Sequence, residues 1–154
     1  MSIALMEKIA EGTFVRLSGN SYKVLGKAIY STRNDPESKY AKMLLEGHHV
    51  LVIAPDEMAY FGINKGHLSE FDSFEKIVEY DGKKLKQTNA DYQIRISLEF
   101  GSPSEVEGNV LFWDYEPIDD SDDGLIISVG EDESTKERAD VVARFIEFDE
   151  IEVY

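Results

Sequence analysis

The densest group of residues that could bind a cation lies near position 120. The stretch DYEPIDDSDDGLIISVGEDE, residues 114 to 133, places aspartates at positions 119, 120, 122 and 123, directly before Gly124. Carboxylates followed by glycine and an apolar residue resemble the start of an EF-hand-type loop, in which about 6–8 oxygens surround calcium at a sharp turn. Calcium binding is therefore the first chemistry to consider.

The spacing of this stretch does not complete a calcium loop. Five required positions are matched, by Asp119, Ser121, Asp123, Gly124 and Ile126. The twelfth position, where a bidentate glutamate should stand, is Gly130, and Glu131 follows one residue late. The flanking segments FWDY and LIISV are typical of strands and not of two helices. We predict an acidic turn between two strands. Its alternatives are a cation site of another kind or a docking surface for a basic partner, built from Asp119, Asp120, Asp122 and Asp123.

Two aromatic residues beside the acidic turn are further candidates for cation binding. In LFWDYEP, Trp113 and Tyr115 share one strand face, and Phe112 and Asp114 share the other. An exposed Trp or Tyr beside carboxylates suits a cationic ligand through cation–π attraction. The alternative is that Trp113 is simply the largest core residue.

Other catalytic and metal-binding patterns are missing from the sequence. There is no cysteine, which excludes disulfides, thiolate metal clusters and a cysteine nucleophile. His48 and His49 are adjacent and would point to opposite faces of a strand, while His67 has no second ligand at metal spacing. No nucleophile elbow, zinc-protease motif or phosphate loop occurs. We therefore predict no metal, no cofactor and no catalytic residue, with a hydrolase using a carboxylate pair as a third alternative.

Charge is distributed unevenly along the chain. The net charge is −15, but residues 1 to 104 carry 14 acidic against 13 basic residues, whereas residues 105 to 154 carry 17 against 3. An anionic surface repels phosphate backbones and favours cationic partners. The chain also lacks a basic stripe, so we expect no nucleic-acid binding.

The composition is that of a globular protein. With 154 residues, 42% hydrophobic, the chain has the size of one domain. The N-terminal segment MSIALMEKIAEG is too short and too charged for a signal peptide or a membrane span. We expect a cytoplasmic protein without membrane insertion, and its oligomeric state stays open.

Short apolar–polar alternations separated by turn residues predict antiparallel β structure. The segments TFVRL and YKVLGKAIYS flank SGNS as a hairpin, and Asp81-Gly82 marks a second one. We predict a mainly β domain, a barrel-like or sandwich meander of roughly ten strands, with a short N-terminal helix around Ile3 to Ala10. Two loosely similar halves, about 11–64 and 75–154, each read as a hairpin followed by a longer meander.

Two further expectations concern the second half of the chain. In DYQIRISLEFG, strict alternation predicts that Tyr92, Ile94, Ile96, Leu98 and Phe100 share one face. At the C-terminus, residues rich in aromatic and β-branched side chains favour a strand over the last ten positions. A capping-box pattern at Ser134 leaves a helix over 135–144 as the alternative.

The second half also resembles a bacterial protein family. The order YDGKKLKQTNADYQIRISLEFG, GNVLFWDYEP, GLIISVGEDESTKE and FDEIEVY is similar to the domain of unknown function 4178, and EGTFVRLSGNSYKVLGKAIYS is similar to the family's opening hairpin. The resemblance implies a mainly β cytoplasmic bacterial domain and supplies no catalytic residue. Family members are often encoded near polyamine enzymes and membrane-stress proteins, which implies a partner role.

The function expected from the sequence is non-enzymatic. The leading hypothesis is binding of a basic protein surface through the anionic last third. The alternative is a small cationic ligand, polyamine-like, or a metal cation, held by the same acids with Trp113 or Tyr115.

Overall fold

Two tight hairpins begin the two halves of the chain. In the computed structural model, Ser18-Gly19 and Asp81-Gly82 all have positive φ, between 51° and 81°. Positive φ at both central residues defines the type I′ turn, whose twist matches that of antiparallel strands. Both hairpins predicted from the sequence are confirmed.

The structure describes residues 2–101, 109–119 and 124–154. In chain order its elements are α1 (Ser2–Lys8), β1 (Phe14–Leu17), β2 (Asn20–Thr32), β3 (Lys39–Leu45), η1 (Glu46–His48), β4 (His49–Ala54), β5 (Met58–Asn64), η2 (Ser69–Phe71), β6 (Ile77–Tyr80), β7 (Lys83–Phe100), β8 (Val110–Pro117), β9 (Leu125–Asp132), β10 (Val141–Ile146), η4 (Phe148–Glu150) and β11 (Glu152–Val153). The mainly β class and the short N-terminal helix are confirmed. In this described part, no helix combines the length and apolar character needed to cross a membrane.

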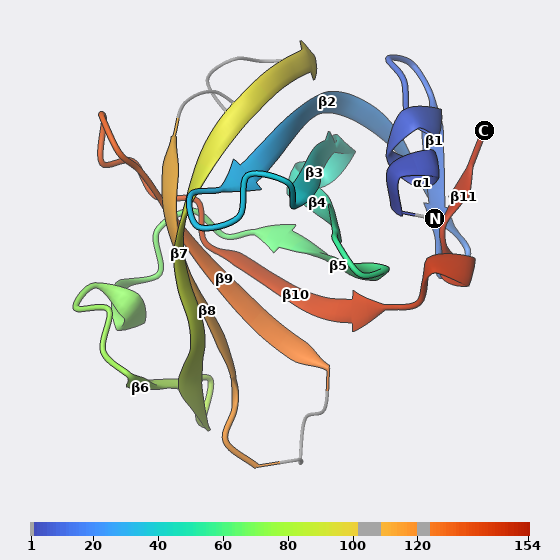
Figure 1. Cartoon of the computed structure of the whole chain (residues 1–154). Helices are drawn as coiled ribbons and strands as arrows, with labels where there is room; N and C mark the ends of the chain where they lie inside the picture. Colours follow the sequence, from blue (N-terminus) through green and yellow to red (C-terminus); the bar gives the residue numbers. More distant parts are fainter. Residues whose placement is uncertain (1, 102–108, 120–123) are drawn as a thin grey trace.

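Eight of the strands close into a ring. Their order is β2-β3-β4-β5-β10-β9-β8-β7, and β7 pairs back onto β2. All the pairings are antiparallel. Strands β1 and β11 extend the sheet from one end of β2, and β6 extends it from one end of β7 (Figure 1). The barrel-like alternative is therefore the correct one.

Each half of the chain contributes four consecutive strands to the ring. Strands β2 to β5 form one meander and β7 to β10 the other, and each meander begins with the second strand of a hairpin. The halves meet at two seams, where β5 pairs with β10 and β2 pairs with β7. An origin of the halves by duplication stays a prediction.

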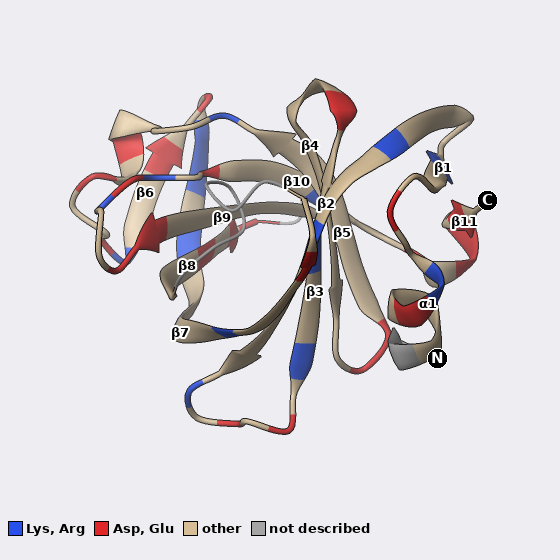
Figure 2. Ribbon diagram, turned by 90° about the horizontal axis from the view of Figure 1, so that it is seen from above, with Lys and Arg blue, Asp and Glu red and all other residues tan. Residues whose placement is uncertain are grey.

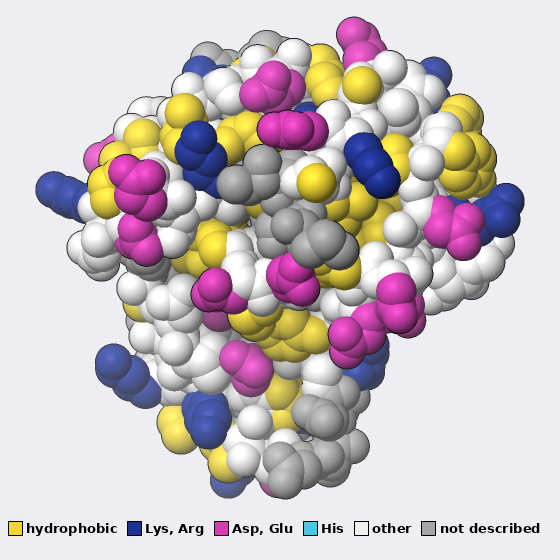
Figure 3. All heavy atoms as spheres, turned by 45° about the vertical axis from the view of Figure 1, so that its right-hand side comes forward, with side chains coloured by type: hydrophobic (Ala, Val, Ile, Leu, Met, Phe, Trp, Pro, Cys, Tyr) yellow, Lys and Arg dark blue, Asp and Glu magenta, His cyan; other side chains and the backbone are white. Residues whose placement is uncertain are grey.

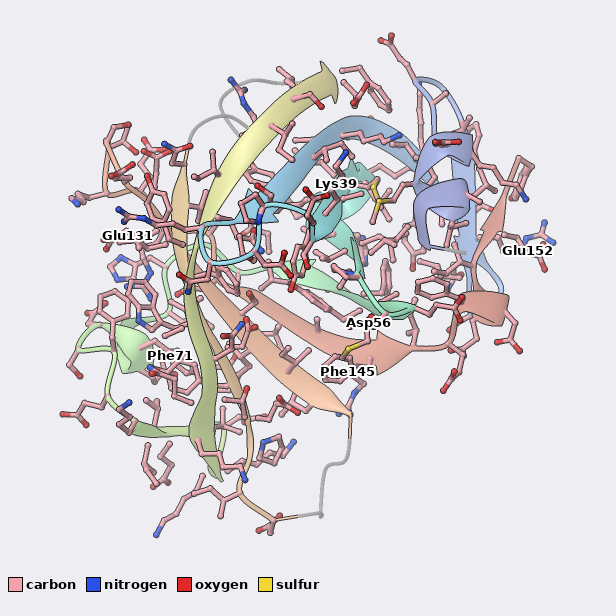
Figure 4. The ribbon with its side chains drawn as sticks, viewed as in Figure 1. Lys39, Asp56, Phe71, Glu131, Phe145 and Glu152 are labelled. Carbon is pink, nitrogen blue, oxygen red and sulfur yellow. The ribbon has the colours of Figure 1, made fainter. Side chains whose placement is uncertain are left out.

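The apolar residues form three clusters, one inside the ring and two outside it. The interior cluster includes Ala28, Leu44, Val50, Ile126 and Ala143. Alternate residues of β3, β4 and β5 face outward and are covered by α1, β1 and the C-terminal segment. The outer faces of β8 and β9 are covered by the 68–74 segment and β6. Phe71, which belongs to this segment, is fully buried (Figure 4).

Strand β7 does not keep the strict alternation predicted for it. Its pairing with β2 shifts register twice, once between Lys27 and Ala28 and once between Ile29 and Tyr30. A bulge changes the face to which the following residues point. Consequently Ile94 and Ile96 lie outside, 38% and 49% exposed. Gln93, on the opposite face of the strand from Ile94, borders the interior cavity.

The C-terminal region contains strand and no α-helix at the described positions 135–144. Val141–Ile146 forms β10, so the helical alternative is wrong. Phe148–Glu150 is a single 3-10 turn, and the chain ends in the two-residue strand β11. The preference for a strand over the last ten residues was therefore correct only in part.

Candidate ligand site in the barrel interior

Inside the ring lies a partly open cavity of about 230 Å³, lined in part by residues of the interior cluster. Eight-stranded barrels have an interior that side chains fill or that holds one small ligand. The aromatic residues that line this cavity are Tyr30, Tyr40, Tyr60 and Phe112. Polar side chains between them are Lys42, Asn64, Gln93 and Ser128, and Asp132, Glu137 and Arg138 line it as well. The interior is therefore unusually polar for the core of a small domain.

Cross-strand pairing places these side chains on one inner surface. Tyr30 on β2 lies directly opposite Tyr40 on β3. Lys42 is paired with Val52, which is paired with Tyr60 on β5. Directly opposed residues of antiparallel strands point to the same face. The sequence spacing Tyr40-x-Lys42 therefore delivers both side chains to the cavity.

Tyr60 is a hydrogen-bond donor and not a proton acceptor at neutral pH. Burial raises its pKa far above the ordinary value of 10.0, and the nearby Asp114 carboxylate raises the pKa further. A side-chain hydrogen bond with Ser128 acts in the opposite direction but is outweighed. Tyr60 keeps some accessible surface in spite of this burial, and it lines the cavity. That surface therefore faces the cavity.

Tyr30 behaves in the same way. Burial raises its pKa to about 12, the Arg95 charge lowers the pKa and the Asp132 charge raises it. The side chain is 3% exposed. Both phenols therefore remain protonated at neutral pH, which argues against a role as general base.

Asp132 is held in its ionised form at the end of β9. The backbone N–H groups of Ser134 and Thr135 both donate to its Oδ1, at 2.9 Å, and the Ser134 hydroxyl donates at 2.8 Å. These hydrogen bonds, with that from Thr135 the largest cause, lower the pKa of Asp132. The cavity thus carries a fixed negative charge.

Arg138 also lines the cavity, but its charge is balanced locally. Its guanidinium donates to the buried Asp140 at 2.7 Å and 3.0 Å and pairs with Asp72 at 3.5 Å. It also lies 5.2 Å from the ring centroid of Phe74. These contacts join the 131–140 turn to the segment that covers β8 and β9 from outside.

The binding candidates taken from the sequence lie elsewhere. Trp113 and Tyr115 do share one face of β8, but that face points into the outer cluster, where Trp113 stacks on Phe74 with centroids 3.9 Å apart. Tyr115 is completely buried, and its hydroxyl donates to the Glu75 carbonyl. The opposite face of β8 supplies Phe112 to the cavity.

The acidic turn connects two adjacent antiparallel strands, β8 and β9, as predicted. Strands therefore occupy the flanks at which an EF-hand requires helices. Asp119 is exposed, whereas Asp120, Asp122 and Asp123 lie outside the described residues. Among the described residues, no group of three or more His, Asp or Glu side chains is arranged to hold a metal ion.

The histidines take part in other contacts. The His49 ring stacks parallel to Phe61, with centroids 5.3 Å apart, at the wall of an open groove of about 510 Å³ on the outer face of β5 and β10. His67 contacts Asp72. The outer groove is less enclosed than the barrel interior, which makes the interior the better candidate site.

Sequence reasoning missed the interior site because its polar residues look like solvent-facing ones. In KYAKMLL, for example, alternation assigns Tyr40 and Lys42 to the face opposite Ala41 and Met43. Both faces of β3 are in fact covered, one by the outer cluster and one by the ring. The sequence does contain one indication that both faces of this strand are covered. Each face carries apolar or aromatic residues, namely Ala41, Met43 and Leu45 on one face and Tyr40 and Leu44 beside Lys42 on the other.

Comparisons with protein-family models, with curated proteins and with solved structures find no match to this chain. The resemblance to the domain of unknown function 4178 therefore stays a prediction.

Proposed function

We propose that the chain is a binding protein for a small polar organic molecule, held inside the barrel. The observation that carries this proposal is the cavity of about 230 Å³ with phenol, amide, ammonium and carboxylate groups on its wall. This volume lies just below the roughly 300–1,000 Å³ of sites for drug-sized ligands. A compact metabolite fits the space better than a lipid or a peptide.

The arrangement supports binding more than catalysis. The two tyrosines with raised pKa stay protonated, and no group of three or more His, Asp or Glu side chains among the described residues is arranged to hold a metal ion. The small cationic ligand expected from the sequence remains within this class. We propose that such a ligand binds in the barrel interior and not at the acidic turn.

The test is a stabilisation screen of small polar molecules followed by native mass spectrometry. We expect one molecule per chain to bind and to raise the melting temperature. Val110→Phe would fill the cavity and should abolish binding. Leu111→Phe, the next residue of β8 on its other face, should bind as the wild type does. Equal binding by both variants would contradict an interior site.

The charge of the last third supports a second proposal, which is docking of a basic protein. Residues 105 to 154 carry 17 acidic and 3 basic residues. Elsewhere on the ribbon, acidic and basic residues are interspersed (Figure 2). Reversing the charge of Asp119, Asp120, Asp122 and Asp123 should then abolish recovery of a partner in a pull-down without lowering the melting temperature. Unchanged recovery would remove this proposal.

A further inference from the structure

Aromatic side chains reach the cavity from four strands of the ring. Tyr30 lies on β2, Tyr40 on β3, Tyr60 on β5 and Phe112 on β8. In the order of the ring, β4 lies between β3 and β5, β10 and β9 lie between β5 and β8, and β7 lies between β8 and β2. A molecule in the cavity therefore meets aromatic side chains on several sides.

Two of these residues offer the cavity mainly their rings. Phe112 has no polar atom in its side chain, so its ring is all that a ligand can contact. The Tyr60 hydroxyl is engaged in a hydrogen bond with Ser128, and the surface that Tyr60 retains faces the cavity. The faces of Phe and Tyr rings attract a positive charge. These two rings therefore favour a cation over an anion.

Carboxylates lie beside the same two rings. Asp114 shares the inner face of β8 with Phe112, because the two residues are two positions apart on one strand. Its negative charge raises the pKa of Tyr60, so this carboxylate is close to the second ring as well. Asp132 ends the neighbouring strand β9, lines the cavity and is kept ionised by the hydrogen bonds that lower its pKa. Negative charge and aromatic rings thus occupy the same part of the wall.

The basic groups around the cavity do not cancel this negative charge. The Arg138 guanidinium is paired with Asp140 and Asp72. Lys42 takes part in an interaction within the chain, and its strand β3 lies across the ring from β9, with three strands between them in either direction. Arg95 lies beside Tyr30 and, among the described residues, does not belong to the lining of the cavity. The wall formed by β8 and β9 therefore favours a cationic ligand.

The lining also indicates which kind of cation fits. A primary ammonium has three N–H donors that need acceptors, whereas aromatic rings and the neighbouring Val52, Val110 and Val141 offer none. A metal ion needs several oxygen ligands, and among the described residues no group of three or more His, Asp or Glu side chains is arranged to hold one. An ammonium group that carries methyl groups needs no acceptor and packs against rings and valines alike.

We propose that the ligand is a compact quaternary ammonium compound, whose methylated nitrogen contacts the rings of Tyr60 and Phe112, with Asp114 and Asp132 as its counter-charges. This inference rests on the proposed function, because it names the class of molecule that the interior site takes. At about 30 Å³ for each water-sized group, the cavity holds roughly eight non-hydrogen atoms. Choline has about this size, whereas spermidine is larger.

The first experiment compares matched probes on the full-length chain by isothermal titration calorimetry. Choline and tetramethylammonium carry the methylated cation. The alcohol 3,3-dimethylbutan-1-ol has the shape of choline without its charge, and ethanolamine has the charge without the methyl groups. We expect choline or tetramethylammonium to bind ten-fold or more tightly than these two probes and than spermidine. Vesicles of phosphatidylcholine present the same group on a membrane surface and should not sediment the protein, because the group must enter the barrel.

The second experiment tests the residues that hold the cation. Phe112→Leu keeps an apolar side chain but removes the ring, and it should remove the advantage of choline over 3,3-dimethylbutan-1-ol. Asp114→Asn should reduce this advantage, whereas Tyr60→Phe keeps the ring and should retain it. Phe14→Leu and Asp149→Asn make the same chemical changes at exposed positions and should leave it unchanged. Each variant is judged by a ratio of two affinities, so a general loss of stability does not imitate the result.

The outcomes separate this inference from the proposed function. If ethanolamine, spermidine or the neutral alcohol binds at least as tightly as both quaternary compounds, and Val110→Phe abolishes that binding, the quaternary ammonium is overturned and the interior site is retained. A preference for choline that survives Phe112→Leu, or binding to vesicles alone, would also overturn the inference. If no small polar molecule binds in the screen, both proposals fail.

Discussion

At the scale of single residues, the interior tyrosines are the most distinctive feature. Both side chains are desolvated by burial, which disfavours the phenolate. Tyr30 and Tyr60 thus act as fixed donors across the physiological range of pH. A site that recognises its ligand through them should bind with little dependence on pH, except where the ligand itself titrates.

The same tyrosines predict an alkaline loss of stability. The pKa of Tyr30 rises from 10.0 in the unfolded chain to about 12 in the folded one. Above pH 10 the unfolded state binds fewer protons than the native state, so stability falls as the pH rises and the contribution is lost by about pH 12. Denaturant titrations should show a fall to which Tyr30 contributes up to about 2–3 kcal/mol.

Variants test this assignment directly. Tyr30→Phe should have a smaller alkaline fall in the free energy of unfolding than the wild type. Tyr154→Phe changes a ring that is 54% exposed and should retain the full fall. An identical pH profile for wild type and Tyr30→Phe would contradict the raised pKa.

The Arg138–Asp140 pair gives a second prediction at this scale. Asp140 is completely buried and the Arg138 side chain is 5% exposed. Asp140→Asn leaves a buried guanidinium without its main partner, and we expect the free energy of unfolding to fall by about 3–5 kcal/mol. Asp72→Asn removes the exposed partner of the same arginine and should cost less than about 1 kcal/mol. Chemical denaturation measures both, and equal costs would argue against the buried pair as the anchor.

At the scale of elements, much of the fold follows from local sequence. The type I′ signal of Asp81-Gly82 and the SGNS cluster place both hairpins, because only a few residue types tolerate two successive positive φ angles. Short apolar–polar alternations correctly indicate the antiparallel β class. These features depend on neighbours in the chain, which a single sequence contains.

The candidate site could not be predicted in the same way. Which face of a strand lies inside a closed ring depends on strands that are distant in sequence, and in β7 it depends on two bulges created by pairing with β2. Strict alternation placed Ile94 on the same face as Leu98, whereas Ile94 lies on the outside and Gln93 borders the cavity. The carboxylates of the acidic turn are close together in the sequence and are therefore visible in it. The interior residues come from separate strands.

The seam between β5 and β10 should be sensitive to any added volume. A Cβ atom at Gly62 would lie 2.1 Å from the Val142 carbonyl oxygen and 2.5 Å from the Ala143 Cα atom. Backbone atoms cannot yield as a flexible side chain does, so Gly62→Ala should lower the free energy of unfolding by about 1–3 kcal/mol. At Gly26 a Cβ would find ordinary contacts of 3.5 Å and longer, and Gly26→Ala should change stability by less than about 1 kcal/mol. Thermal and urea denaturation compare the two variants, and equal stability would contradict this close approach.

At the scale of the whole molecule, the two halves depend on each other. The interior cluster combines Ala28 and Leu44 from the first half with Ile126 and Ala143 from the second. Neither half can close a ring alone, since each supplies four of the eight strands. Acidic, basic and apolar side chains are mixed on the molecular face shown in Figure 3.

This interdependence predicts a single cooperative unfolding transition. Trp113 lies in the second half and reports on its packing against Phe74. Urea curves followed by Trp113 fluorescence and by far-ultraviolet circular dichroism should coincide, because loss of either seam removes the interior of both halves. Two separated midpoints would show that the halves unfold independently.

The arrangement of the two seams has a consequence for how such a ring can be encoded. Each seam is antiparallel and joins corresponding strands of the two halves, the first of each meander at one seam and the last at the other. A chain of half this length could therefore build the same barrel by meeting a copy of itself, β2 against β2 and β5 against β5. When one chain carries both halves, the two walls of the cavity need not be identical. It is this freedom that allows lysine on one wall and carboxylates on the other.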